Sequence, residues 1–220
     1  MSTETNYKDG EKHGISKSYD ENGRLIRADN WVNGKRVVLN FTDARDGRKY
    51  DMVNIGTQTW MAENLDYKYG NSWCYNDKPE MCKSCGRLYD WVTAMKSCPK
   101  GWHLPSADEW NILLNFAHGG EKAGFVLKAN GGWAGDGKGI DDYEFTALPC
   151  GGRSNNAFND ANYLSYWWSA TEYDANNVWA PFMAYDTVST LSSIVNKQGV
   201  FGIPLNKNIA GISVRCVKDK

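Results

Sequence analysis

The sequence has no long hydrophobic run, no excess of one charge and few histidines, and each absence argues against a class of function. Its apolar runs are only a few residues long, so we expect no membrane span. With 25 basic and 26 acidic residues the net charge is −1, which leaves no basic surface for a nucleic-acid partner. The three histidines are scattered, and neither a nucleophile elbow nor a phosphate-binding loop occurs.

An export signal is also lacking, because the polar start Met-Ser-Thr-Glu-Thr-Asn has no apolar core. Cysteine is present at six positions, an even number that permits three disulfides. Disulfides persist in oxidising compartments, so paired cysteines would place the protein outside the cytoplasm, with its export signal removed. The alternative is a cytoplasmic protein with six reduced, mostly buried thiols.

Proline is scarce, with six residues, whereas the chain holds 22 Gly, 10 Trp and 12 Tyr. This composition predicts a loop-rich protein whose core is anchored by aromatic side chains. A length of 220 residues suffices for one core and a small appendage. We assign the appendage to residues 1–45 and the main domain to residues 46–220.

Residues 1–45 contain turn dipeptides between short segments of alternating aromatic and polar residues. Asp9-Gly10 and Asn33-Gly34 are the clearest, and they predict a small β-meander of hairpins. The stretch YKDGEKHGISKSYDENGRLIRADNWVNGKRV resembles the bacterial variant of the MORN repeat in about one and a half copies. Fewer than three repeats rarely stand alone, so this segment is expected to pack on its neighbour or on another chain. The alternative is an ordinary N-terminal hairpin.

Strand patterns in the main domain are short. Residues 48–55 alternate as a strand does, and residues 56–62 supply the returning strand after a glycine turn. The chain becomes loop-rich after Gly120, and long loops tend to carry function. Further short strands are predicted around Phe145, residues 167–168, residues 178–179, Phe182 and residues 212–217.

Two helices are predicted between these strands, which gives an α+β fold class. The first has Leu88, Trp91, Val92 and Met95 at helical spacing over about three turns, and it ends before Pro99. The second starts with a capping box at Ser106-x-x-Glu109. Its apolar residues continue to Ala117, and Gly119-Gly120 ends it.

Six segments, in order, carry a family resemblance: DGRKYDMVNIGTQTWMAENL, GRLYDWVTAM, CPKGWHLPSADEW, DDYEFTALPCGGR, YWWSATE and ISVRCVK. Together they resemble the Fibrobacter succinogenes major paralogous domain family over residues 46–218. That family looks like a branch of the C-type-lectin-like superfamily, which also contains formylglycine-generating enzymes and the variable proteins of diversity-generating retroelements. The resemblance implies a C-type-lectin-like fold, with two helices flanking a twisted antiparallel sheet and terminal strands side by side.

The resemblance also implies a disulfide between the end of the first helix and the last strand, where Cys98 and Cys216 stand. A zinc site is the alternative, because Cys82-x-x-Cys85 with Cys74 and Cys98 could supply four thiolates at loosely suitable spacing. If all six cysteines pair, the other disulfides would be Cys74 with Cys82, across a short loop, and Cys85 with Cys150.

Motifs for catalysis and for calcium-dependent sugar binding are missing. The related oxidases depend on a thiol pair shortly before the terminal strand, and residues 195–210 contain no cysteine. Neither Glu-Pro-Asn nor Gln-Pro-Asp occurs, so a lectin-type sugar site is not expected. His103 is interpreted as a packed, hydrogen-bonded residue rather than a base. One acidic stretch could hold a structural Ca²⁺, the alternative being a solvated loop: Asp136, Asp141, Asp142 and Glu144.

The best candidate binding surface is the loop region of residues 153–208, which mixes rigid aromatic rings with adaptable amides as antibody loops do. Trp167, Trp168 and Trp179 are expected to pack mainly in the core. Alanine at Tyr173, Asn176 and Asn177 is expected to weaken binding without lowering the melting temperature. The candidate ligand-binding residues are Asn155, Asn156, Asn159, Asn162, Tyr163, Tyr166, Tyr173, Asn176, Asn177, Trp179 and Tyr185.

These observations favour a non-catalytic extracellular or cell-surface module that binds a polysaccharide or a protein and needs no cofactor. The resemblance suggests two alternatives. One is a diversified receptor-binding protein of a retroelement, and the other is an oxidase of the formylglycine-generating type.

Overall fold

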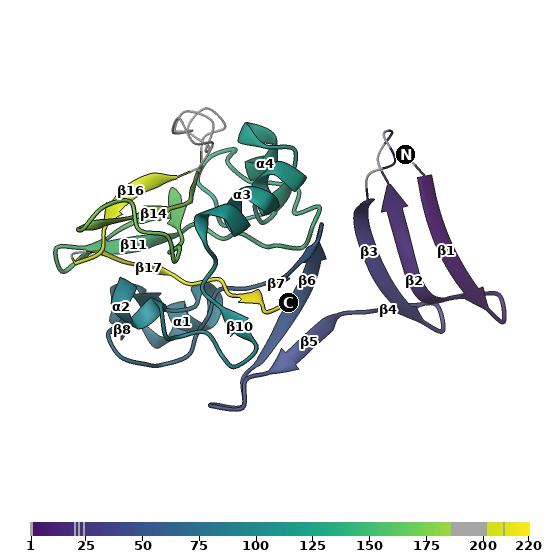
Figure 1. The fold of residues 1–220 in the computed structure, drawn as a ribbon, viewed down its shortest axis with the longest axis horizontal. Coiled ribbons are helices and arrows are strands. Elements are labelled where there is room, and N and C mark those ends of the chain that lie inside the picture. The colour runs from purple at the N-terminus through teal and green to yellow at the C-terminus, as the bar shows by residue number, and fades with distance from the viewer. Residues whose placement is uncertain (1, 20, 22, 24, 186–201, 209) are drawn as a thin grey trace.

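The computed structural model describes residues 2–19, 21, 23, 25–185, 202–208 and 210–220. This part of the chain is largely β, with four α-helices and mainly antiparallel strand pairs, in agreement with the predicted α+β class. Figure 1 shows a separate N-terminal sheet on one side and the remaining sheets and helices gathered on the other.

The N-terminal sheet is the predicted β-meander. Its tight turns carry Asp9-Gly10 and Asn33-Gly34, all at the positive φ that such hairpins require. Arg36 links this sheet to the main domain, because its Nη1 lies 2.6 Å from Glu144 Oε2. The strands are β1 (Ser2–Lys8), β2 (Glu11–Tyr19), β3 (Leu25–Val32) and β4 (Lys35–Val37).

A five-stranded sheet begins the main domain and also receives the C-terminal strand. The hairpin predicted from residues 48–62 forms here, with Gly56 at a φ of 61° in its turn. Val217 pairs with Trp60, so the last strand lies beside this hairpin. Residues 39–42 also pair here, not with the N-terminal meander. The sheet order is β10 (Trp102–His103), β18 (Val217–Lys218), β7 (Gln58–Met61), β6 (Lys49–Ile55) and β5 (Leu39–Thr42).

A third sheet joins strands that are far apart in the sequence. Its centre pairs Arg153 with Gly211, and Ile212 with Tyr89. The order is β15 (Phe182–Ala184), β13 (Leu164–Tyr166), β11 (Cys150–Ser154), β17 (Ala210–Ser213), β9 (Leu88–Tyr89) and β8 (Ser72–Trp73), with β12 (Ala157–Ala161) also beside β11. Two further strands, β14 (Asn177–Ala180) and β16 (Ile203–Asn206), pair with each other.

Two strand predictions need correction. The terminal strand predicted at residues 212–217 is divided, because the chain leaves one sheet after Ser213 and enters another at Val217. Phe145 was expected in a strand but lies outside the strands, where its ring is completely buried. Burial of an aromatic residue therefore did not require a strand at this position.

The second predicted helix forms as α3 (Ala107–Phe116). Ser106 Oγ accepts a hydrogen bond from the Glu109 backbone N–H at 3.2 Å, and Glu109 Oε2 accepts one from the Ser106 N–H at 2.9 Å. A further helix, α4 (Gly120–Leu127), begins almost directly after it, where a loop was expected. Another unpredicted helix, α1 (Pro79–Cys85), lies just after the short 3₁₀ turn at Tyr75–Asp77.

The first predicted helix is wrong in extent. Leu88 and Tyr89 form a strand, because their backbones pair with β17 and β8. Asp90 then caps a single turn, α2 (Trp91–Ala94), by accepting a hydrogen bond from the Thr93 N–H at 2.8 Å. Val92 is 62% exposed, so the apolar stripe does not face the core.

Tryptophan rings form the centre of the core, as predicted for Trp167 and Trp168, which are 1% and 0% exposed. Trp110 of α3 packs between Trp60 and Trp167, with ring centroids 4.7 and 5.8 Å away. Trp179 is also buried, at 7% exposed. Large rings thus supply most of the packing that this loop-rich chain needs.

A network of buried, hydrogen-bonded polar side chains lies within this core. The side-chain oxygen of Asn64 accepts hydrogen bonds from Trp167 Nε1 at 2.9 Å and from Arg215 Nε and Nη2 at 3.0 and 2.7 Å. Arg215 also donates to the carbonyl of Phe145. Burial lowers the pKa of Arg215 to about 9, because desolvation disfavours its charged form.

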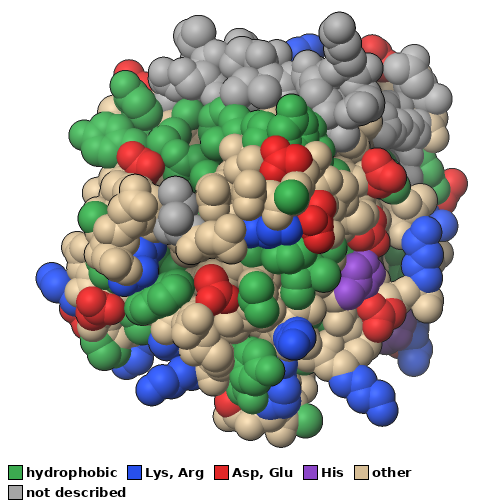
Figure 2. All heavy atoms as spheres, turned by 60° about the vertical axis from the view of Figure 1, so that its left-hand side comes forward, with side chains coloured by type: hydrophobic (Ala, Val, Ile, Leu, Met, Phe, Trp, Pro, Cys, Tyr) green, Lys and Arg blue, Asp and Glu red, His purple; other side chains and the backbone are tan. Residues whose placement is uncertain are grey.

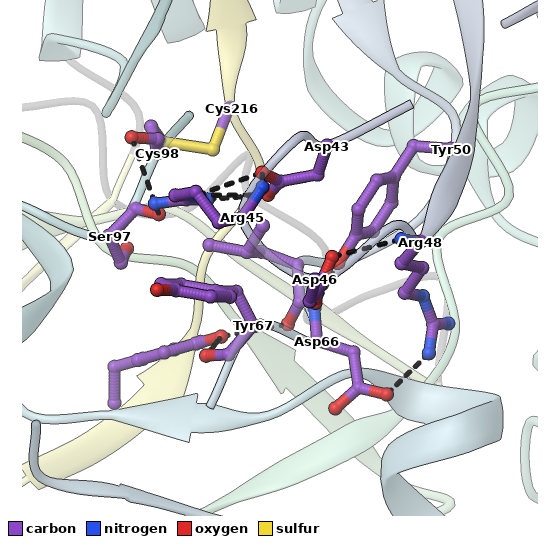
Figure 3. Close-up of polar contacts among 12 residues, drawn as sticks. Asp43, Arg45, Asp46, Arg48, Tyr50, Asp66, Tyr67, Ser97, Cys98 and Cys216 are labelled. Atoms are coloured by element: carbon purple, nitrogen blue, oxygen red, sulfur yellow. Dashed lines mark hydrogen bonds and ion pairs between the residues drawn. A yellow bond between two sulfur atoms is a disulfide. The ribbon is translucent and has the colours of Figure 1, made fainter. Parts of the chain in front are cut away.

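Figure 3 shows a second polar cluster beside the Cys98–Cys216 disulfide. Arg45 donates from Nε to Asp43 Oδ1 at 2.9 Å and from Nη2 to Oδ2 at 2.6 Å, and the Asp43 side chain is buried. Arg45 also donates to the Ser97 carbonyl at 2.8 Å. Its guanidinium lies 3.8 Å from the centroid of the Tyr67 ring. Burial opposes ionisation of Asp43, but the hydrogen bonds from Arg45 hold its pKa below the usual value. Because these charges are satisfied internally, we interpret the cluster as structural.

Candidate functional site

All six cysteines form disulfides, in the pairing that the sequence suggested: Cys74–Cys82, Cys85–Cys150 and Cys98–Cys216. Paired sulfurs are not the thiolates that a zinc site needs, so the zinc alternative is wrong. The alternative of six free thiols is also wrong, because every cysteine is paired.

The four acidic residues proposed for Ca²⁺ do not converge. Asp141 Oδ1 and Oδ2 accept hydrogen bonds from the backbone N–H and hydroxyl of Thr146, at 2.7 and 2.8 Å. Glu144 pairs instead with Arg36. Within the described residues, which include Asp136 and Asp142, no group of three or more acidic, histidine or cysteine side chains could hold a metal ion. The structure therefore gives no support to a calcium site here.

His103 is held between two carboxylates, as its interpretation as a hydrogen-bonded residue predicted. Its Nδ1 lies 2.7 Å from Asp219 Oδ1, and its Nε2 lies 2.8 Å from Glu109 Oε1. Partial burial opposes the charged form, but hydrogen bonds to Asp219 and Glu109 raise the pKa of His103. The arrangement fastens the C-terminal segment to α3.

The candidate ligand-binding residues fall into three groups on the molecule. The first is an aromatic pair in which Tyr163 and Tyr185 meet edge to face, with centroids 5.2 Å apart. Both rings are exposed, at 52% and 39%. Asn162 precedes this pair, and its carbonyl accepts a hydrogen bond from the Ala134 N–H. Residues 186–201 of the predicted surface lie outside the described residues.

The second group surrounds the turn before β14. Asn177 Nδ2 donates to both carboxylate oxygens of Asp174, at 2.9 and 2.8 Å, so this amide holds the turn. Asn176 is exposed, whereas Tyr173 packs edge to face on the buried Trp179 at 4.8 Å. Tyr173 is nevertheless 52% exposed, so Asn176 and one side of the Tyr173 ring can both reach a ligand.

The third group, with Asn155, Asn156, Asn159 and Tyr166, surrounds Arg153 on β11. Two cavities of about 150 and 310 Å³ adjoin here, because both are lined by Arg153 and Ala210. We call this pair of cavities the Arg153 cleft. Its smaller part has an apolar wall from β16 and a polar wall from β11 and β12.

The larger part of the cleft is polar. Its lining includes Asn71, Asn155, Asn156 and Asn208, together with Trp73. Figure 2 shows the side of the molecule that carries β11, β14, β16 and β17 in Figure 1. Hydrophobic side chains gather most in the upper part of this face, with smaller groups below, between polar, acidic and basic side chains (Figure 2).

Glycine at position 211 leaves room for the Trp73 ring in the lining of the cleft. A Cβ on Gly211 would lie 3.0 Å from the Trp73 ring and 3.4 Å from the Arg153 Cβ, so a side chain there would displace the ring. Arg153 instead lies over that ring, with Cζ 4.4 Å from the Trp73 centroid, and 5.6 Å from the Phe158 centroid. The aromatic contacts fix the position of the guanidinium.

The sequence indicated Arg153 and Asn208 only as the two ends of the loop region, and it did not indicate Asn71 or Trp73. These residues meet because β17 and β9 lie between β11 and β8 in the sheet. The pairings of Arg153 with Gly211 and of Ile212 with Tyr89 join segments 58 and 123 residues apart, and no local sequence pattern would reveal them.

The fold and the cleft together define a class, a small disulfide-crosslinked α+β domain with an open, amide-lined cleft on one face. Within that class, a family model matches residues 53–218, and the chain belongs to the Fibrobacter succinogenes major domain family. Comparison with curated proteins and with solved structures gives no match. No helix in the described residues has the length and apolar character to cross a membrane.

Proposed function

We propose that the protein is a non-catalytic binding module that recognises a polysaccharide or protein ligand through the Arg153 cleft. The supporting observation is the concentration of exposed amides and one cation at a cavity with an aromatic wall. Ligand sites usually combine an apolar or aromatic wall with a few polar groups at fixed positions. Oxidase chemistry of the formylglycine type is disfavoured, because all six cysteines are tied up in disulfides.

We also propose a C-type-lectin-like arrangement for residues 46–220. The pairing of the last strand with the first hairpin and the Cys98–Cys216 bond are both features that the resemblance implied. Three disulfides favour an extracellular or cell-surface location. The single-layer sheet β1 to β4 is compatible with a MORN-like segment, which would pack on a partner.

Glycan and protein arrays, followed by titration calorimetry on the hits, would test the binding function. The double variant Asn155→Gly and Asn208→Ala should weaken binding at least tenfold with an unchanged melting temperature, because both amides are exposed. Glycine is chosen at 155 because the φ of Asn155 is 47°. Asn6→Ala in the N-terminal sheet is the matched amide control. Unchanged affinity in the double variant would reject the cleft as the site.

A further inference from the structure

In the part of the chain that the structure describes, Arg153 forms no ion pair. Within the described residues its guanidinium makes one hydrogen bond, from Nη2 to Asn156 Oδ1 at 3.0 Å. Its Nε is buried and has no hydrogen-bond partner. A guanidinium presents five N–H donors, so several donors on this group are unused. Because Nε is enclosed, an external acceptor would pair with the Nη1 and Nη2 N–H groups at the end of the guanidinium, and Nη1 makes no hydrogen bond within the described residues.

The two acidic residues that line the cleft, Asp90 and Asp160, make hydrogen bonds to other residues. Asp90 caps α2 through Thr93 and accepts a hydrogen bond from Asn71 Nδ2 at 2.7 Å. Asp160 accepts one from the Tyr166 hydroxyl at 3.2 Å. Neither carboxylate forms an ion pair with Arg153 in the described structure.

Contacts with two aromatic rings hold the Arg153 guanidinium in one orientation, in which it can pair with a planar group such as a carboxylate. Trp73 and Phe158 both contact Arg153, and Gly211 leaves the space in which the Trp73 ring lies. A guanidinium that is already held in place loses less side-chain entropy when it binds. Its fork of N–H groups matches the two oxygens of a carboxylate, which accept parallel hydrogen bonds.

We propose that the ligand of the Arg153 cleft is an acidic polysaccharide whose uronic acid carboxylate pairs with Arg153. This inference rests on the proposed binding function and specifies the ligand class for the same cleft. The polysaccharide is favoured over an acidic peptide because four asparagines line the larger cavity, and amides both donate and accept hydrogen bonds, as sugar hydroxyls do: Asn71, Asn155, Asn156 and Asn208. The acidic peptide is an outcome of the test.

The experiment measures binding of the whole chain to polygalacturonate by titration calorimetry, at low salt and with EDTA to prevent bridging by divalent cations. Methyl-esterified polygalacturonate, a neutral glucan and polyglutamate are the comparison ligands. Arg153→Gln keeps most of the side-chain volume and removes the charge, and Arg153→Lys keeps the charge without the planar fork. Lys17→Gln, on the exposed surface of β2, is the matched loss of one positive charge on the far sheet (Figure 1).

Polygalacturonate should bind to the natural chain and to Lys17→Gln alike, and Arg153→Gln should weaken this binding at least tenfold. Arg153→Lys should lie between them, and esterification of the ligand should remove the effect of Arg153. Equal melting temperatures would show that the variants are folded.

Three results would overturn the inference. Tight binding to the neutral glucan that does not depend on Arg153 would refute the pairing of a ligand carboxylate with Arg153, and it would still support the binding function. Binding to polyglutamate alone would assign the cleft to acidic peptides. Absence of binding to every probe would refute the acidic polysaccharide, while the wider arrays would decide the binding function separately.

Discussion

Loss of the Cys98–Cys216 disulfide should destabilise the protein more than loss of Cys74–Cys82, by an amount set by loop length. The two bonds close sequence separations of 118 and 8 residues. In the chain-entropy model these separations correspond to about 5 and about 2.5 kcal/mol at 25 °C. When the Cys85–Cys150 bond is intact, the covalent path between Cys98 and Cys216 through that bond is only about 80 residues long. The contribution of the Cys98–Cys216 bond then falls to about 4.5 kcal/mol.

The comparison uses two double variants, Cys98→Ala with Cys216→Ala and Cys74→Ala with Cys82→Ala. Each pair contains one buried cysteine, because Cys216 is 0% exposed and Cys82 is 4% exposed. The cavities left by the sulfurs are therefore similar, and the difference reports mainly on loop closure. Arg45 still bonds the Ser97 carbonyl in the first variant, so the turn next to residue 98 keeps a native anchor (Figure 3).

Urea denaturation under non-reducing conditions gives the free energy of unfolding of both variants. The long-loop variant should be less stable than the short-loop variant by about 2 kcal/mol, and its melting temperature should be lower by about 4 to 8 °C. Its m-value should also rise, because the unfolded chain is less constrained. Equal losses, or a larger loss from the short loop, would refute the loop-entropy reasoning.

Two further predictions concern the core and pH. Asn64→Ala should lower the free energy of unfolding by about 3 kcal/mol or more, because Arg215 and Trp167 Nε1 lose their acceptor. Asn64→Asp should lower it less, because an acceptor oxygen remains. Equal losses of the two variants in urea denaturation would contradict this order. His103→Asn should lower the melting temperature more at about pH 5 than at about pH 9. The pKa of His103 is raised in the folded state, so the stability that its charged form contributes is present at low pH and is lost as the pH rises through that pKa. A difference that does not depend on pH would contradict the pairing of charged His103 with Asp219 and Glu109.

Features with a local physical cause were predicted best. The hairpin at residues 48–62 and the capping box at Ser106 depend on neighbouring residues, and both are present. The helix at Leu88 was predicted too long, because its spacing is helical but its backbone is taken by strand pairing with distant segments. The acidic stretch was a candidate Ca²⁺ loop with a solvated loop as the alternative, and in the structure Thr146 and Arg36 bind the carboxylates of Asp141 and Glu144.

The sequence by itself predicted the family, the α+β class, the Cys98–Cys216 disulfide and the tryptophan core, because motifs and aromatic content are properties of the chain. The structure decided between three disulfides and the zinc or free-thiol alternatives. Only the tertiary structure decided where a ligand can bind. At the Arg153 cleft, β17 brings Gly211 beside Arg153, and the small glycine leaves room for Trp73 to lie against that side chain. Contacts between segments distant in sequence arise from sheet order, which no short pattern specifies.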